Sequence, residues 1–238
     1  MTKYHEVRDQ LLDRLDDMAA GEQLAPERDL AAELGVSRMT LRRATDELVA
    51  AGLVRRRPGA GVFAVGPKLD SPLAATSFTE DMRARGMRPG SRVLAMATRP
   101  AGARVARRLE VSPTADVLNV IRLRLADDEP MSIESLYTPS SLVPGLGRAD
   151  LEGGSYYELL RTRYGVEIAR GVQTIEPTVT DEEESRELGV PLHSPALLFE
   201  RTSWSADGTV VEFVRSVYRG DRYQIRTELA VPSPSPAR

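Results

Sequence analysis

The stretch that decides the fold is "SRMTLRRATDELVAAG", residues 37–52. Ser37 suits the N-cap of a helix and Gly52 suits its end. Leu41, Ala44 and Leu48 recur at helical spacing, so they predict the inward face of that helix. The opposite side of the helical wheel carries three cations and one apolar side chain: Arg38, Met39, Arg42 and Arg43.

The flanking segments complete a small domain. Apolar residues recur at helical spacing over 4–18, and "APERDLAAELG", residues 25–35, predicts a second, short helix. Only Gly35 and Val36 separate that helix from the third, and "LVRRRPGAGVFAV", residues 53–65, predicts two strands around a turn. Three helices and a hairpin with this spacing describe a winged helix-turn-helix, whose third helix enters the major groove of DNA.

The local charge supports an interaction with DNA. The whole chain of 238 residues has a net charge of −3, which by itself does not indicate nucleic-acid binding. Residues 1–34 carry four cations and nine anions, whereas residues 35–66 carry six arginines and two anions. A charged helix face is commonly only solvated, but here the arginines coincide with the turn, the cap and the wing. Because the planar fork of arginine suits phosphates and guanine edges, we predict a DNA-binding surface.

Composition excludes several other classes of protein. The chain has no cysteine, which fits a reducing compartment and removes disulfides and thiolate chemistry. His5 and His193 are the only histidines, so a His-rich metal site or a Ser-His-Asp triad is not expected. No apolar run is long enough to span a membrane, and residues 1–4 open no signal peptide. We expect a cytoplasmic protein without cofactor or metal.

Residues 4–66 resemble the N-terminal domain of the GntR family of bacterial transcription regulators, on the segment "LAPERDLAAELGVSRMTLRRATDELVAAGLVRRRPGAGVFAV", residues 24–65. The family pattern runs L-P-S-E-R-x-L-A, G-V-S-R-x-T-V-R, G-L-V and G-x-G-T-F-V. The chain departs from it at Ala25-Pro26, where Pro-Ser is common, at Val62, where Thr is common, and at Met39, where a small or polar residue is frequent. The resemblance implies a DNA-contacting set with a glycine at the wing tip: Arg28, Ser37, Arg38, Thr40, Arg42 and Gly59.

The pattern changes to mixed strands and helices from about residue 93. Strands are predicted over 93–100, 117–127, 131–137 and 171–179, with a hairpin over 196–219 around Asp207-Gly208 and a last strand over 223–229. Helices are predicted over 101–111, 155–165 and 181–189. Because hairpin turns join most of the strands, we predict an α+β fold with a mainly antiparallel sheet.

A helix start follows the boundary between the two parts. In "TSFTEDMRARG", residues 76–86, Ser77 and Glu80 form a capping box, which leaves the hydroxyl of Thr79 spare. A bound anion would use both hydroxyls and the free N–H groups at the helix N-terminus.

Two arginines point to the same kind of ligand. Arg122 and Arg124 are two apart on a strand, so their side chains lie on one face. Their like charges repel unless an anion lies between them or each has a carboxylate partner, for which Glu134 and Glu212 are the candidates. Further polar residues start a helix or follow the strands: Ser155, Tyr157 and Tyr218. Together these groups predict a site for a phosphorylated polyol.

Residues 70–229 resemble the UTRA effector-binding domain of the HutC branch of the GntR family. "TSFTEDMRARGMRPGS", "IRLRLADDEPMSIES" and "SVYRGDRY" are similar to segments of amino-sugar regulators of the NagR/DasR type. The resemblance implies a chorismate-lyase-like fold and, as effector, glucosamine-6-phosphate or N-acetylglucosamine-6-phosphate. It places Ser77, Thr79, Arg122, Arg124, Ser155 and Tyr157 around the phosphate. It places Glu134, Glu212 and Tyr218 against the sugar.

These observations predict a transcriptional regulator that binds a palindromic DNA operator as a homodimer and responds to a phosphorylated sugar. The expected domains are a winged helix-turn-helix over 1–66, a linker over 67–75, an effector-binding and dimerisation domain over 76–231 and a disordered tail over 232–238. One alternative keeps DNA binding and has another sugar phosphate or a carboxylate as effector. A second alternative is a chorismate-lyase-like enzyme, against which stands the lack of an activated nucleophile or an evident acid/base pair.

Overall fold

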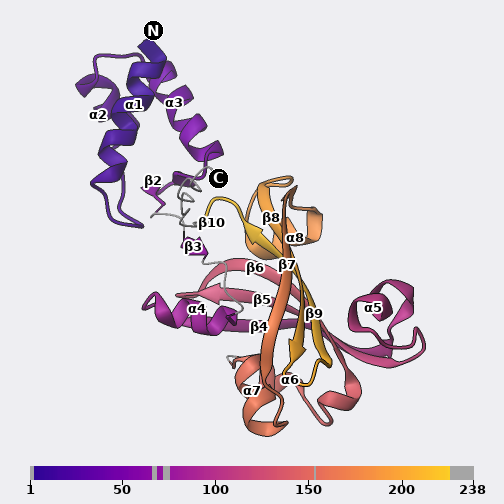
Figure 1. The fold of residues 1–238 in the computed structure, drawn as a ribbon. Coiled ribbons are helices and arrows are strands. Elements are labelled where there is room, and N and C mark those ends of the chain that lie inside the picture. The colour runs from indigo at the N-terminus through magenta and orange to yellow at the C-terminus, as the bar shows by residue number, and fades with distance from the viewer. Residues whose placement is uncertain (1–2, 66–68, 72–75, 153, 226–238) are drawn as a thin grey trace, which may run out of the picture. The chain divides into compact units, whose positions relative to one another are not determined.

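A computed structural model describes residues 3–65, 69–71, 76–152 and 154–225 of the chain (Figure 1). The chain divides into two compact units, Met1–Leu69 and Asp70–Arg238, which are considered one at a time below. Of the predicted linker only residues 69–71 are described, and the predicted tail lies outside the described residues.

The first unit has the elements that its sequence predicts. Ser37 caps the third helix, because its Oγ accepts a hydrogen bond from the Thr40 N–H at 3.1 Å. The hairpin is antiparallel, with Val54 opposite Ala64 and Arg57 opposite Gly61. The elements in chain order are α1 (Lys3–Asp16), α2 (Glu27–Glu33), α3 (Arg38–Ala50), β1 (Val54–Arg57) and β2 (Gly61–Ala64).

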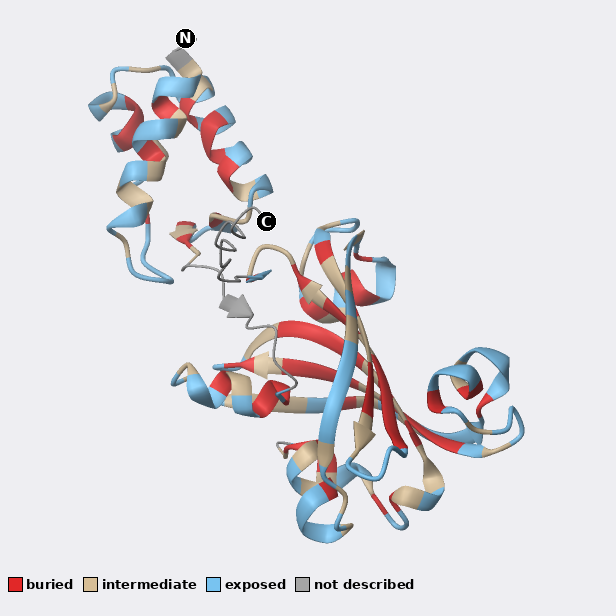
Figure 2. Cartoon of the chain, viewed as in Figure 1, coloured by how far each residue is buried: buried red, intermediate tan, exposed pale blue. Residues whose placement is uncertain are grey.

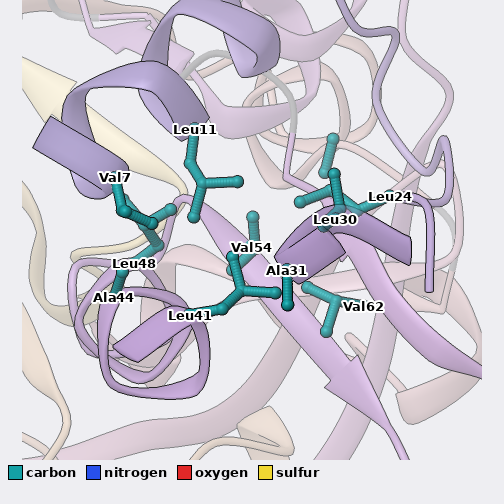
Figure 3. Packing of buried hydrophobic residues seen from close by; sticks show 11 residues of the cluster. Val7, Leu11, Leu24, Leu30, Ala31, Leu41, Ala44, Leu48, Val54 and Val62 are labelled. Atoms are coloured by element: carbon teal, nitrogen blue, oxygen red, sulfur yellow. The ribbon is translucent and has the colours of Figure 1, made fainter. Parts of the chain in front are cut away.

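One apolar cluster holds this unit together (Figure 3). Leu11 of α1 and Leu41 of α3 have no exposed surface, and they meet Leu30 of α2 and Val62 of the hairpin in the cluster. The outer side of α3 is exposed, as its sequence predicts (Figure 2). The four residues of that side are Arg38, Met39, Arg42 and Arg43.

The second unit is built on a six-stranded antiparallel sheet with the order β4-β5-β6-β9-β8-β7. The strands are β4 (Pro89–Pro100), β5 (Asp116–Ala126), β6 (Glu129–Pro139), β7 (Ile168–Val179), β8 (Pro195–Ser205) and β9 (Val210–Arg219). Two runs of three strands that follow one another in the chain meet at the central pair of β6 and β9. This arrangement confirms the predicted α+β class with an antiparallel sheet.

The helices of this unit cover both faces of the sheet. They are α4 (Phe78–Ala84), α5 (Gly102–Leu109), α6 (Arg148–Leu151), α7 (Tyr156–Arg163) and α8 (Glu182–Leu188). Val120 of β5 clusters with residues of α6 and α7, whereas Val117 clusters with α5 and Leu123 with α8. Because side chains alternate along a strand, α6 and α7 lie on one face and α5 and α8 on the other.

The structure differs from the sequence-based prediction at four short elements, one of which is the strand β3, within the predicted linker. The last strand, β10 (Tyr223–Ile225), pairs with β3 (Leu69–Ser71) in a separate two-stranded sheet and does not extend the large one. The four-residue α6 and the 3₁₀ turn η1 (Ser140–Leu142) were not predicted. Each is too short to show a periodic apolar pattern.

Replacing Leu41 by alanine should lower the free energy of unfolding by about 2–5 kcal/mol, because a cavity would remain in the core of the first unit. Urea denaturation followed by circular dichroism measures this loss. Met39→Ala on the same helix is the control, since this side chain is 77% exposed and its loss should change stability by less than about 0.5 kcal/mol. Equal losses in the two variants would contradict the assignment of the inner and outer faces of α3.

Candidate functional site

The register of the large sheet gathers polar residues on one of its faces. Arg122 of β5 lies opposite Glu134 of β6, which in turn lies opposite Ser216 of β9. On the next pair of strands Glu212 lies opposite Ser203, two positions along from Arg201. Cross-strand partners share a face, and so do residues two apart on a strand. The same face therefore carries the four acidic and basic residues named here, together with Arg124 and Tyr218.

Two adjoining hollows lie over this face. The smaller has a volume of about 20 Å³ and brings together seven predicted site residues: Ser77, Thr79, Arg122, Arg124, Glu134, Tyr157 and Glu212. The larger, of about 50 Å³, is lined by Ser77, Glu134 and Tyr218, among others. The hollows share walls at Ser77, Phe78, Glu134, Arg201 and Val214.

Arg122 has a carboxylate partner. Its Nε donates to Glu134 Oε1 at 2.9 Å and its Nη2 donates to the same oxygen. Its Nη1 is buried and has no hydrogen-bond partner among the described residues. The sequence left open whether Arg122 pairs with a carboxylate, and the structure shows that it does.

Arg124 has no carboxylate partner among the described residues, although its side chain is only 2% exposed. Its Nη2 donates to Thr79 Oγ1 at 3.0 Å, and its guanidinium lies 4.6 Å from the centre of the Phe78 ring. Its Nε and Nη1 are buried, and no described group accepts from them. A buried cation of this kind carries a desolvation cost that no ion pair offsets.

The predicted helix start holds as a capping box, and it occupies Ser77. The Glu80 N–H donates to Ser77 Oγ at 3.2 Å, and the Ser77 N–H donates to Glu80 Oε2 at 3.0 Å. The Ser77 hydroxyl also donates to the same carboxylate. Ser155 caps α7, and its hydroxyl oxygen lies 3.5 Å from that of Ser77. Thr79 is the hydroxyl that reaches Arg124.

Glu212 lies in a second polar cluster on this face. It accepts from the Tyr157 hydroxyl at 2.6 Å and from Ser203 Oγ at 2.8 Å, and Arg201 Nε lies 3.8 Å away. Its side chain is 1% exposed, so these donors replace water around the carboxylate.

Burial and charge shift the pKa values of this face in opposite directions. Burial, with the charge of Arg122 added, lowers the pKa of Arg124 to about 10, so this side chain is a cation at neutral pH. Burial acts to raise the pKa of Glu134, but the charges of Arg122 and Arg124 outweigh it and hold that pKa below its usual range. Burial raises the pKa of Glu212, and it raises the pKa of Tyr218 to about 12. The ionised groups on this face therefore leave an excess of positive charge.

Arg201 is a site residue that the sequence reasoning missed. It lines both hollows, its Nη1 donates to the Thr76 carbonyl oxygen at 3.3 Å, and its guanidinium lies over the Tyr157 ring. A signal for it was present, because extending the hairpin register back from the Asp207-Gly208 turn places Arg201 beside Glu212 on one face.

A second candidate site lies on the first unit, along α3 and the hairpin. Arg38 and Arg42 are exposed and have no ion-pair partner among the described residues. Gly59 lies at the hairpin turn with φ +73°. Arg42, Arg57 and Gly59 line an open groove of about 520 Å³ that also borders the start of α2.

Other predicted DNA-contacting residues have partners within the unit. Arg28 is exposed in the first turn of α2 and pairs with Asp29 at 2.9 Å. The hydroxyls of Ser37 and Thr40 lie 2.9 Å apart, so Ser37 serves the helix cap. The contact of these residues with DNA stays a prediction.

The part of the chain that the structure describes has neither a group of metal ligands nor a membrane-spanning helix. No group of three or more His, Cys, Asp or Glu side chains there could hold a metal ion. No helix in the described segments is long and apolar enough to cross a membrane.

Both units match known families. Residues 3–64 match the family described as "Bacterial regulatory proteins, gntR family", and residues 84–224 match the UTRA domain. The HTH-type transcriptional repressor NagR of Bacillus subtilis is 36% identical to this chain over 223 residues, 92% of this chain and 91% of that protein.

Two further relatives extend the comparison over nearly the whole chain. The crystal structure of PhnF from Mycobacterium smegmatis has a TM-score of 0.66 and 33% sequence identity, covering 95% of this chain and 100% of that one. MngR of Escherichia coli, the mannosyl-D-glycerate transport/metabolism system repressor, is 28% identical over 224 residues, 93% of each protein.

Replacing Glu134 by glutamine should lower the free energy of unfolding at pH 7 by about 3–5 kcal/mol, because Arg122 would lose its buried partner. The folded protein lowers the pKa of Glu134, so this contribution is present above the ordinary carboxyl pKa and is lost as pH falls through the lowered value. The gap between wild type and variant should therefore narrow between about pH 5 and pH 2.

Urea denaturation at pH 7 and at pH 3 measures the gap. Glu200→Gln is the control, since Glu200 pairs with the exposed Arg104 and Arg108 and should cost about 1 kcal/mol or less. If the difference in the free energy of unfolding between wild type and Glu134→Gln does not change with pH, the charge of Glu134 does not contribute to stability.

Proposed function

The chain belongs to the GntR family of bacterial regulatory proteins and carries a UTRA domain of the HutC type, and we propose that this DNA-binding transcriptional repressor is controlled by a phosphorylated sugar. The relatives that match both units are transcription regulators, which argues against the alternative of a chorismate-lyase-like enzyme.

The observation that carries the effector proposal is the unpaired cation of Arg124. Two of its nitrogens are buried without an acceptor among the described residues, and one nitrogen of Arg122 is in the same state. A phosphate offers several oxygens that accept charge-assisted hydrogen bonds from such nitrogens. A phosphate against Arg124, Arg122 and Thr79 would therefore supply both the missing charge and the missing acceptors.

The larger hollow supports a sugar at the other end of the ligand. Glu134 and Tyr218 border it and offer partners for hydroxyl or amino groups, and Arg201 stands between the two hollows. Glucosamine-6-phosphate and N-acetylglucosamine-6-phosphate have both ends. In this proposal Ser77, Ser155 and Tyr157 support the phosphate end. Glu212, which the sequence predicts at the sugar end, lines the smaller hollow and not the larger one, so it would meet the part of the sugar next to the phosphate.

The hollows, at about 50 Å³ and 20 Å³, hold a few water molecules and not a whole sugar phosphate. Binding would therefore have to move their common wall, which includes Arg201 and Glu134. A ligand that binds one arrangement of the wall more tightly than another shifts the protein toward that arrangement. This difference in affinity is what a ligand needs in order to change the affinity for an operator.

A different anionic sugar derivative is the second candidate effector. MngR is named for a mannosyl-D-glycerate system, and glycerate carries a carboxylate where the first candidates carry a phosphate. The guanidinium of Arg124 would bind either anion, so a screen must include both classes.

The DNA-binding part of the proposal uses α3 and the hairpin. Arg38 and Arg42 would contact DNA from the first turns of α3, Gly59 from the wing tip, and Arg28, Ser37 and Thr40 from the surrounding surface. The protein would act in the cytoplasm as a homodimer, which suits a palindromic operator with two half-sites.

A thermal-shift screen of sugar phosphates and sugar carboxylates tests the effector proposal. A ligand at 100 times its Kd adds about 2.7 kcal/mol to the free energy of unfolding, which raises the melting temperature measurably. Glucose without a phosphate is the matched negative ligand. A screen in which no phosphorylated sugar raises the melting temperature would remove the proposal.

Replacing Arg124 by methionine should stabilise the ligand-free protein by about 1–3 kcal/mol, because it removes a buried charge without a partner. The same variant should lose the melting-temperature shift with glucosamine-6-phosphate. Arg219→Met is the matched control, since this buried arginine is paired with Asp221 and should destabilise the protein when replaced. An Arg124→Met variant that binds the ligand with wild-type affinity in calorimetry would refute the phosphate site.

Replacing Arg42 by alanine should weaken operator binding by about 1–3 kcal/mol if the side chain reads a guanine. Effector binding should not change, because Arg42 lies in the other unit. A gel-shift titration measures the first quantity and calorimetry the second. Unchanged DNA affinity would refute the role of Arg42.

A further inference from the structure

Met39 is the most exposed of the large hydrophobic side chains in the described part of the chain, at 77%. Apolar side chains that are exposed one at a time are common on protein surfaces, so exposure alone carries no inference. The position of Met39 does, because it is the second residue of α3, directly after Ser37 and Arg38.

The inner face of α3 fixes where Met39 points. Leu41, Ala44 and Leu48 are buried in the core of the first unit. Met39 lies two residues before Leu41, about 200° around the helix, and so on the outer side. Arg42 follows it by three residues, which makes the two side chains neighbours on the helix surface.

The cations around Met39 differ in what they contact. Arg43 lies over the Tyr4 ring at 4.9 Å, whereas Arg38 and Arg42 have no ion-pair partner among the described residues. The first two turns of α3 thus present one apolar side chain beside two cations that are available to DNA.

The chemistry of the major groove matches this arrangement. The N-terminal residues of a recognition helix contact base edges there, and arginines bind phosphates or guanine. The one apolar group that the base edges present in this groove is the 5-methyl of thymine. The unbranched, flexible side chain of methionine adapts to such a contact.

We infer that Met39 is a specificity-determining residue that packs against a thymine methyl group in the operator. The inference rests on the proposed placement of α3 in the major groove. Residue 39, where the family pattern often has a small or polar residue, would in this protein favour a thymine in the operator.

Removal of single methyl groups from DNA tests the inference. The full-length protein is first used to select its preferred operator from random DNA. Each thymine is then replaced in turn by deoxyuridine, which lacks only the 5-methyl. At one thymine of each half-site wild-type protein should lose about fourfold in affinity per methyl, the value of one buried methylene-sized group.

The variant Met39→Ala closes the test. It should bind the thymine operator more weakly than wild type and should bind the thymine and deoxyuridine operators equally well at that position. Leu192→Ala, which removes a side chain that is 56% exposed in the other unit, is the control and should keep the wild-type difference. Circular dichroism checks that both variants are folded.

Two results would overturn the inference in different ways. If wild type binds every deoxyuridine operator as well as the thymine operator, or if Met39→Ala keeps the full difference, Met39 does not read a methyl group. If neither Arg42→Ala nor Met39→Ala changes binding to the selected operator, α3 does not face DNA, and the placement fails together with the inference.

Discussion

The alternation of side chains across the six-stranded sheet is the constraint on which the effector unit depends. The pairing of β5 with β6 sets Arg122 opposite Glu134, and the pairing of β8 with β9 sets Ser203 opposite Glu212. A slip of one residue in either pairing would send these polar groups to the face that packs against α5 and α8. The register thus keeps the polar site on the face that also carries the apolar cluster under α6 and α7, and it keeps these charges away from the apolar clusters under α5 and α8.

The charges on the polar face do not balance in the free protein. Glu134 neutralises the charge of Arg122, and Glu212 accepts from Tyr157 and Ser203 and lies near Arg201. Arg124 is left with a threonine hydroxyl and the face of Phe78. Buried charges without partners destabilise a fold, so their retention is typical of sites that bind an opposite charge. The unpaired charge makes the empty site less stable than an apolar core of the same size. An anion that pairs with this charge removes that cost, which favours its binding.

Local patterns in the sequence predicted most of the elements, and seven of the predicted site residues line one hollow. The cap at Ser77, the pair Arg122 and Arg124, and the turn at Asp207-Gly208 are each visible within a few residues, and the structure has each of them. Local patterns do not predict which residues are neighbours across strands, because the strand order β4-β5-β6-β9-β8-β7 cannot be read from local spacing. The separate pairing of β10 with β3 was missed for this reason, whereas Arg201 could have been found from the register of the β8–β9 hairpin. The sequence left open whether the two arginines have carboxylate partners or face a bound anion. Only the structure shows that Arg122 is paired and that Arg124 is not.

The ion pairs of Arg56 have a consequence for the salt dependence of DNA binding. Its guanidinium donates to Glu27 of α2 and to Asp46 of α3, so it ties the hairpin to two helices. Arg43 and Arg57 lie over aromatic rings of their own unit. Each arginine that neutralises a phosphate releases condensed counterions, and the slope of binding against salt counts those arginines. An arginine already neutralised by two carboxylates releases few counterions, so the operator affinity of this protein should fall less steeply with salt than its six clustered arginines suggest.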